Sequence, residues 1–119
     1  MSEVEKIIEK AKQVNGMIRR LDELGRIVLP KDYRQGKVVD GQTKVAIYHI
    51  KDYVIVEILE DSADTNKKVD ELGRVVINIE IRNELEWKEK DSIETWNFGK
   101  YFILKKVAMQ CVFCGKKKD

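Results

Sequence analysis

Two cysteines near the C-terminus carry the most recognisable site chemistry in this sequence. Cys111 and Cys114 are separated by two residues and followed by Gly115. Two thiolates at this spacing can chelate one zinc ion, and the glycine lets the backbone turn around it. A closed structural site needs four ligands, and the chain holds no second cysteine pair. Either two chains share one zinc ion through four cysteines, or the pair is a free dithiol without metal. We expect that the protein requires no cofactor, with zinc shared between two chains as the possible exception.

Catalytic chemistry has little support elsewhere in the sequence. We find no Gly-rich phosphate loop, no nucleophile elbow and no cluster of histidines that could bind a metal. His49 is the only histidine, and it lies in a predicted β-hairpin. The carboxylates Asp22 and Glu23 lie in a predicted turn, where nothing buries them or raises a pKa. We therefore expect that the protein is not an enzyme.

One charged stretch occurs twice. Asp-Glu-Leu-Gly-Arg stands at residues 22–26 and again at 70–74. The segment 19–59 aligns with the segment 67–107 without a gap, and nine positions are identical. The glycine can adopt positive φ, so each copy predicts a tight turn. Apolar β-branched runs at 27–29 and 75–77 then predict a strand after each turn.

Both aligned segments predict the same order of elements: a strand, a short helix and a hairpin. Pro30 can open the first helix, and Asn78 can cap the second. An amphipathic helix is predicted over 3–15, because apolar residues recur there at every third or fourth position. The predicted organisation is a helix at 1–16, a first segment at 17–59, a linker at 60–66, a second segment at 67–107 and a basic tail at 108–119.

The two copies have a physical reason to occur together. A segment of about 41 residues is too small to bury a core alone. Two segments could close a β-barrel and remove exposed strand edges. The N-terminal helix is short, so it must pack on something. It either docks on its own core or binds a partner, for example in a homodimer, which the cysteine pair could also bridge.

These features resemble the AbrB/SpoVT family of bacterial transcription regulators. The resemblance rests on Asp-Glu-Leu-Gly-Arg before an apolar strand, on a short helix with Arg34 or Arg82, and on a hairpin ending in Leu-Lys-Lys. It implies a mainly β fold with short helices. In the family, two identical chains normally form a swapped-hairpin β-barrel. Here two tandem repeats in one chain would form it, with the N-terminal helix added.

The resemblance also implies a transcription regulator that binds double-stranded DNA. In the family, basic residues beside the first strand, in the Gly-Arg turn and on the short helix contact DNA. The corresponding residues of this chain, with their immediate neighbours, are Arg19, Arg20, Arg26, Arg34, Lys67, Lys68, Arg74 and Arg82. Guanidinium groups bind phosphate bidentately and can read guanine edges. The neighbouring carboxylates of Asp22, Glu23, Asp70 and Glu71 are expected to orient the turn arginines rather than to contact an anion.

Two observations weaken or compete with this prediction. The net charge of +2 gives no global signal for nucleic acid. A second helix arginine of the family is Gln35 here and Asn83 in the second segment, so fewer phosphates should be contacted and binding should depend less on salt. The alternative is an antitoxin-like or regulator-pairing module that keeps the barrel and binds a protein partner.

The location follows from what the sequence lacks. No run of 18 apolar residues is present, so we expect no membrane span. The N-terminus is too charged for the apolar region of a signal peptide. We therefore expect a cytoplasmic protein.

Overall fold

The computed structural model describes residues 2–29, 43–60, 62, 64–65 and 67–107. Arg34, Cys111, Cys114 and the predicted helix after Pro30 therefore lie outside the described residues. The elements in chain order are α1 Glu3–Ala11, β1 Met17–Arg20, β2 Arg26–Val28, β3 Val45–Ile50, β4 Tyr53–Ile58, β5 Arg74–Val76, α2 Ile79–Leu85, β6 Ser92–Phe98 and β7 Tyr101–Lys106. The described part of the chain is mainly β with two short helices, as the sequence predicts.

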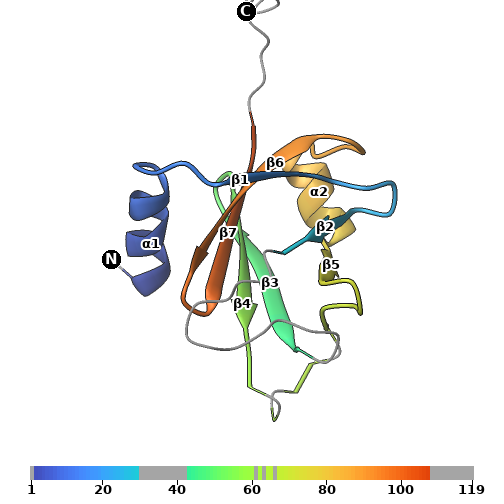
Figure 1. The fold of residues 1–119 in the computed structure, drawn as a ribbon, viewed down its shortest axis with the longest axis horizontal. Helices are drawn as coiled ribbons and strands as arrows, with labels where there is room; N and C mark the ends of the chain where they lie inside the picture. The colour runs from blue at the N-terminus through green and yellow to red at the C-terminus, as the bar shows by residue number, and fades with distance from the viewer. Residues whose placement is uncertain (1, 30–42, 61, 63, 66, 108–119) are drawn as a thin grey trace, which may run out of the picture.

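The strands form two antiparallel sheets. Five strands pair in the order β1-β6-β7-β4-β3, while β2 pairs with β5 in a two-stranded ribbon. The larger sheet lies between α1 on one side and the ribbon with α2 on the other (Figure 1). The expected closed barrel is not formed by the described strands, because β2 and β5 are short and pair with each other rather than with the larger sheet.

The strand registers relate the two segments by a pseudo-twofold axis. Ile27 pairs with Val75 at the centre of the ribbon, and Ile55 pairs with Ile103 where β4 meets β7. The members of each central pair are equivalent positions in the alignment of the two segments. In each sheet, the pairs on either side of the central pair are equivalent to each other: the alignment converts Arg26–Val76 into Arg74–Val28, and Val54–Leu104 into Phe102–Val56. The pseudo-twofold axis therefore passes through both sheets.

Each segment pairs its first extended stretch with the hairpin of the other segment. Arg20 in β1 lies opposite Ser92 in β6, and Lys68 forms the equivalent bridge to Lys44 before β3. Outside the ribbon, the Leu29 amide donates to the Gly73 carbonyl at 2.9 Å. The reciprocal bond, from the Ile77 amide to the Gly25 carbonyl, is also 2.9 Å long. The two segments are thus joined by backbone hydrogen bonds on both sides of the axis.

The main core lies between the two sheets and α2. Among the residues that the structure describes, fourteen are buried in this core, and twelve of them form pairs of equivalent positions in the two segments, namely Leu21 and Val69, Ile27 and Val75, Leu29 and Ile77, Val45 and Ile93, Val54 and Phe102, and Val56 and Leu104. The other two, Ile81 and Trp87, belong to the second segment. Since both segments contribute equally to the paired positions, neither could bury these side chains alone.

A second core lies between α1 and the opposite face of the large sheet. Ser2 caps α1, accepting from the Glu5 amide while the Glu5 carboxylate accepts from the Ser2 amide. Ile7, Ile8 and Ala11 are buried against the sheet. Of the two alternatives for this helix, docking on its own core is the one observed. Neither described helix has the length and apolar character needed to cross a bilayer.

The predicted end of the N-terminal helix is wrong. The helix was predicted to continue to residue 15, but it stops at Ala11, and Lys12 is its C-cap. The chain leaves the helix early because it must reach β6: the Trp96 Nε1 donates to the Val14 carbonyl at 2.9 Å. Next to it, the Gly16 amide donates to the Glu94 carboxylate at 2.6 Å. The two ribbon strands also begin one position earlier than predicted, at the arginine of each turn.

Candidate nucleic-acid interface

The first Asp-Glu-Leu-Gly-Arg stretch folds into a turn held by one carboxylate. Oδ1 of Asp22 accepts from the amides of Leu24 at 2.9 Å and Arg26 at 2.8 Å. Oδ2 accepts from the Arg26 Nε at 2.7 Å. Gly25 has a φ of +78°, which a residue with a Cβ adopts only at a cost. The carboxylate therefore fixes both the turn and the direction of the arginine.

The second stretch repeats this arrangement. Oδ1 of Asp70 accepts from the amides of Leu72 and Arg74, both at 2.9 Å, and Oδ2 accepts from the Arg74 Nε at 2.8 Å. Gly73 has a φ of +80°. Of the four carboxylates predicted to orient the arginines, Asp22 and Asp70 are confirmed in this role by these contacts. Glu23 and Glu71 are exposed, and the arginine Nε atoms are bound by the aspartates instead. The two turns lie at the two ends of the ribbon, related by the pseudo-twofold axis.

The carboxyl groups of Asp22 and Asp70 have lowered pKa values. Partial burial alone would raise each pKa, but hydrogen bonds from the following arginine and from the leucine amide outweigh it. A carboxyl whose pKa is lower in the folded state stabilises the fold above its unfolded pKa of about 3.9. That contribution is lost as the pH falls through the lower folded value.

We expect this linkage to appear as acid sensitivity. Unfolding by urea at several pH values below about 5 should show the wild-type midpoint falling with pH, while Asp22→Asn/Asp70→Asn shows a flatter fall from a lower midpoint at neutral pH. The exposed neighbours provide the control Glu23→Gln/Glu71→Gln, which should keep the wild-type acid dependence. An unchanged acid slope in the aspartate variant would contradict the role of these turns.

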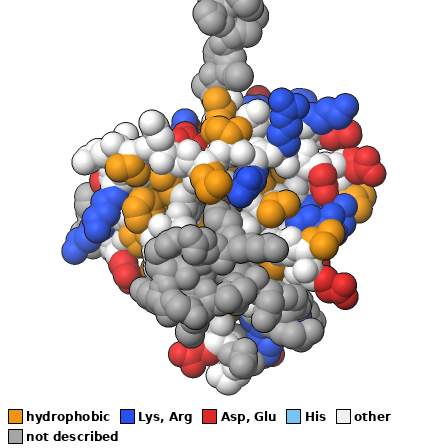
Figure 2. Space-filling model, viewed as in Figure 1, with side chains coloured by type: hydrophobic (Ala, Val, Ile, Leu, Met, Phe, Trp, Pro, Cys, Tyr) orange, Lys and Arg blue, Asp and Glu red, His pale blue; other side chains and the backbone are white. Residues whose placement is uncertain are grey.

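The ribbon presents one face to the core and one to solvent. Ile27 and Val75 are buried, whereas the residues on either side of each point outward. The outward positions are occupied by Arg26 and Val28 in β2 and by Arg74 and Val76 in β5. On the side of the molecule where β2 and β5 lie, hydrophobic, basic and acidic side chains lie next to one another (Figure 2). The two turn arginines are therefore brought to one solvent-facing surface.

Arg82 extends this surface from α2 and contacts the other segment. Its Nε donates to the Ile77 carbonyl at 2.9 Å, and the side chain is half-buried. Its guanidinium lies so close to Gly25 that a methyl group there would overlap it. The glycine of the first turn thus serves two purposes, a positive φ and room for an arginine. Nothing in the sequence pattern indicated this contact between segments.

Lys67 lies close to Arg82. Burial lowers the pKa of the Lys67 ammonium, the Arg82 guanidinium lowers it further, and Glu80 acts in the opposite direction. Two cations held near each other and partly removed from water favour a bound anion, because an anion would relieve their repulsion. We therefore expect Lys67 and Arg82 to act together as a small cationic site beside the first turn.

The remaining predicted basic residues do not all share this surface. Successive side chains of a strand point to opposite faces. Arg19 lies opposite the core residue Ile93, so it shares the core-facing side of β1, and its Nε is buried without a hydrogen-bond partner in the described part of the chain. Arg20 points to the other face and is exposed. By the same alternation, the exposed Lys68 points away from Lys67.

The zinc prediction cannot be compared with the fold. Cys111 and Cys114 lie outside the described residues. Within the ranges that the structure describes, no group of three or more His, Cys, Asp or Glu side chains is placed to hold a metal ion. The cysteine pair and the zinc shared between two chains stay a prediction.

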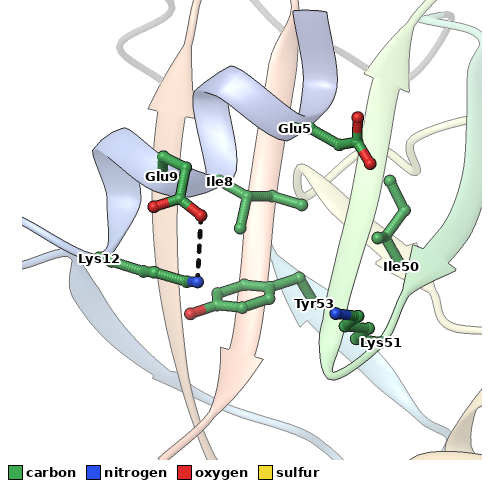
Figure 3. A pocket seen from close by; sticks show the side chains of 7 residues that line it. All are labelled: Glu5, Ile8, Glu9, Lys12, Ile50, Lys51 and Tyr53. Atoms are coloured by element: carbon green, nitrogen blue, oxygen red, sulfur yellow. Dashed lines mark hydrogen bonds and ion pairs between the residues drawn. The ribbon is translucent and has the colours of Figure 1, made fainter. Parts of the chain in front are cut away.

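A small hollow lies on the other side of the molecule, between α1 and the turn of the β3–β4 hairpin (Figure 3). It has a volume of about 160 Å³ and is lined by Glu5, Ile8, Glu9, Lys12, Ile50, Lys51 and Tyr53. Lys12 pairs with Glu9 across 3.2 Å at its rim. Pockets that bind small ligands usually measure about 300–1,000 Å³. This hollow is smaller and lies apart from the Asp–Arg turns, so it is not part of the basic surface.

The geometry defines a small β protein with arginine-bearing turns placed about a pseudo-twofold axis. Part of this chain is similar to the transition state regulatory protein AbrB of Bacillus subtilis (strain 168), with 47% identity over 55 residues, 44% of this chain and 57% of that protein. Abh of the same strain is 55% identical over 40 residues, 34% of this chain and 44% of that protein. The chain spans about half the length of these curated relatives.

Over the matched residues, the chain is similar to AbrB and Abh, which confirms the AbrB resemblance predicted from the sequence. Neither relative is named as an enzyme. No protein-family model matches the chain, and no solved structure gives a significant match. The relation therefore rests on the two regulators and on the residues that carry the resemblance.

Proposed function

We propose that this chain is a transcription regulator that binds duplex DNA with both of its segments. The observation that carries the proposal is the pairing of Ile27 with Val75 at the centre of the ribbon, which relates the Arg26 and Arg74 turns by one axis. A DNA duplex has pseudo-twofold axes of its own, so two equivalent turns can contact two backbone or groove positions alike. The similarity to AbrB, which is named as a regulatory protein, supports the same function.

The exchange of partners between the segments supports a swapped-hairpin arrangement within one chain. β1 of the first segment pairs with β6 of the second, and Lys68 of the second segment forms the equivalent bridge to Lys44 of the first. A dimer of two such domains would exchange the same elements between chains. We propose that the tandem segments act as an intramolecular pseudo-dimer, in the cytoplasm where the chromosome is found.

The arginines are held in a form suited to DNA contact. Each aspartate binds the Nε of its arginine, and the two terminal nitrogens of the guanidinium carry four further N–H donors. These donors can bind a phosphate or the O6 and N7 atoms of guanine. Because the side chains are already oriented, less conformational entropy is lost when DNA binds.

The test is the double variant Arg26→Ala/Arg74→Ala. Each lost arginine contact should cost about 1–3 kcal/mol, so the loss of two should lower affinity for a fluorescent duplex by about 30-fold or more in anisotropy titrations at fixed salt. The matched control is Lys10→Ala/Lys12→Ala at the C-terminal end of α1, on the other side of the molecule, which should bind like wild type. Circular dichroism verifies that both variants are folded. Equal affinity of the arginine variant and wild type would rule out this site.

The alternative is a protein partner, as in an antitoxin-like or regulator-pairing module. DNA binding through phosphates weakens linearly with the logarithm of salt concentration. A chain that binds no duplex even at low salt but retains one protein in a pulldown from its native cells would favour this alternative. The partly exposed arginines on the outward face of the ribbon favour DNA.

A further inference from the structure

Four large apolar side chains are exposed at equivalent positions of the two segments. The exposed fractions are 57% for Leu24, 63% for Leu72, 37% for Val28 and 42% for Val76. Single exposed apolar residues are ordinary on protein surfaces. These four differ because they form two pairs of equivalent positions and belong to the turns and strands that carry the turn arginines. The surface therefore combines apolar side chains with arginines, and both kinds are arranged about the pseudo-twofold axis.

The register places each valine beside an arginine. Val28 in β2 lies directly opposite Arg74 in β5, and Val76 lies directly opposite Arg26, all on the outward face. The two arginines thus occupy diagonally opposite corners of the ribbon's outward face, and the two valines occupy the other two corners. Their β-branched side chains have little rotamer freedom, so they present a fixed apolar surface.

The leucines are presented at the ends of the same ribbon. The amides of Leu24 and Leu72 are fixed by the aspartates of the two turns at 2.9 Å, while their side chains extend into solvent. The backbone of each turn is therefore held rigidly, although the leucine side chain contacts little of the fold. Such a residue is suited to contact with another molecule.

The major groove of DNA offers apolar groups next to polar ones. It admits a two-stranded β-ribbon, and the 5-methyl group of thymine is the apolar group on its base edges. From the residues on this face we propose that Val28, Val76, Leu24 and Leu72 contact thymine methyl groups in the major groove while Arg26 and Arg74 bind neighbouring phosphates or guanines. This inference rests on the proposed DNA-binding function and adds the chemical group on the bases, the thymine methyl, that the protein recognises.

A protein partner fits this surface less well. Each valine lies opposite an arginine across the ribbon. A partner must therefore place an apolar group next to an anion or a hydrogen-bond acceptor, and it must do so at two positions related by the same axis. A duplex meets this requirement through its backbone phosphates and its thymines. A flat apolar protein surface would remove the Arg–Asp pairs from water and offer no acceptor to the terminal N–H donors of the guanidinium groups.

The experiment compares two duplexes that differ in the methyl group alone. Alternating dA·dT and dA·dU duplexes of equal length have the same hydrogen-bonding edges. Wild-type protein should bind the thymine duplex more tightly, by about fourfold for each methyl group that a side chain buries. Titrations by fluorescence anisotropy at fixed salt give the ratio of the two affinities.

Variants then assign the preference to the residues. Val28→Ala/Val76→Ala and Leu24→Ala/Leu72→Ala should each reduce the ratio towards one, with the chain still folded because these side chains are exposed. Val14→Ala is the matched control: it removes an exposed valine near α1 and should keep the wild-type ratio. Size-exclusion chromatography of the same proteins reports whether the surface pairs two copies instead.

The outcomes separate this inference from the proposed function. If neither duplex binds, the proposed DNA-binding function is wrong, and this inference is wrong with it. If both duplexes bind equally, DNA binding holds and methyl contact is excluded. A thymine preference that survives in both double variants would exclude these four residues as its cause. If wild type elutes as a dimer and only the valine or leucine double variants elute as monomers, the surface binds a second copy of the chain instead.

Discussion

Phe102→Ala should lower the free energy of unfolding by about 3–5 kcal/mol, the largest effect that we expect from a single core substitution. The Phe102 ring is fully buried in the main core, on the central strand β7. Truncation removes apolar contacts from both segments at once, since Val54 and Val56 of the first segment belong to the same cluster. The cavity cannot collapse easily because strands are hydrogen-bonded on both sides of β7.

The measurement is urea unfolding followed by tryptophan fluorescence, with Trp87 in the main core and Trp96 in the second core as reporters. Both reporters should give the same midpoint if the two cores unfold together. Ile79→Ala is the control, because this exposed side chain should change stability by less than about 0.5 kcal/mol. A loss below about 1 kcal/mol for Phe102→Ala, against the cost expected for a buried ring, would show that the two sheets do not share this core.

Gly25→Ala should lower the free energy of unfolding by about 2–4 kcal/mol, the sum of a backbone cost and an overlap. The left-handed φ of +78° is the first cause, since a Cβ in this region costs about 1–2 kcal/mol. The second cause is overlap of the new methyl group with the Arg82 guanidinium, which the Ile77 carbonyl holds in place. Chemical unfolding measures the sum of the two.

Two variants separate these causes. Gly73→Ala has an equivalent φ of +80°, and among the described residues no atom lies within 4 Å of the added methyl group, so it should lose the conformational part alone. Arg82→Ala removes the overlap, so the double variant with Gly25→Ala should be more stable than the sum of the two single effects predicts, by about 1 kcal/mol. Simple additivity would mean that Arg82 does not contact Gly25 in solution.

These substitutions bear on function as well as stability. Displacing Arg82 from Gly25 also moves it relative to Lys67, so the cationic site beside the first turn would change. Gly25→Ala should therefore weaken duplex binding more than its loss of stability explains. Phe102→Ala should leave the affinity of the folded fraction unchanged, because its ring lies in the core and not on the ribbon.

Local chemistry in the sequence determined the parts of the site that form within one short stretch. Asp-Glu-Leu-Gly-Arg contains its own carboxylate acceptor, its own arginine donor and the glycine for a positive φ, so the turn could be predicted without the rest of the chain. The hairpins were predicted at residues 44–59 and 93–107, close to their observed bounds, for a similar reason. The small size of each segment also predicted that both contribute to one core.

Features that depend on distant residues were decided by the tertiary structure. α1 ends at Ala11 because Trp96 and Glu94, which lie far along the chain, bind the backbone that follows it. The closed barrel was predicted from the need to remove strand edges, whereas β2 and β5 pair as a separate ribbon. The contact of Arg82 with Gly25 likewise joins residues of different segments, and no local pattern encodes such a distance.

The sequence by itself determined that one turn is written twice and that its arginine is held by its own aspartate, because every group involved lies within the same short stretch. The tertiary structure alone decided that the two turns face each other across an axis and that valines lie opposite the arginines. That outcome depends on the register between β2 and β5, and register is set by packing of Ile27 and Val75 against a core that both segments must complete.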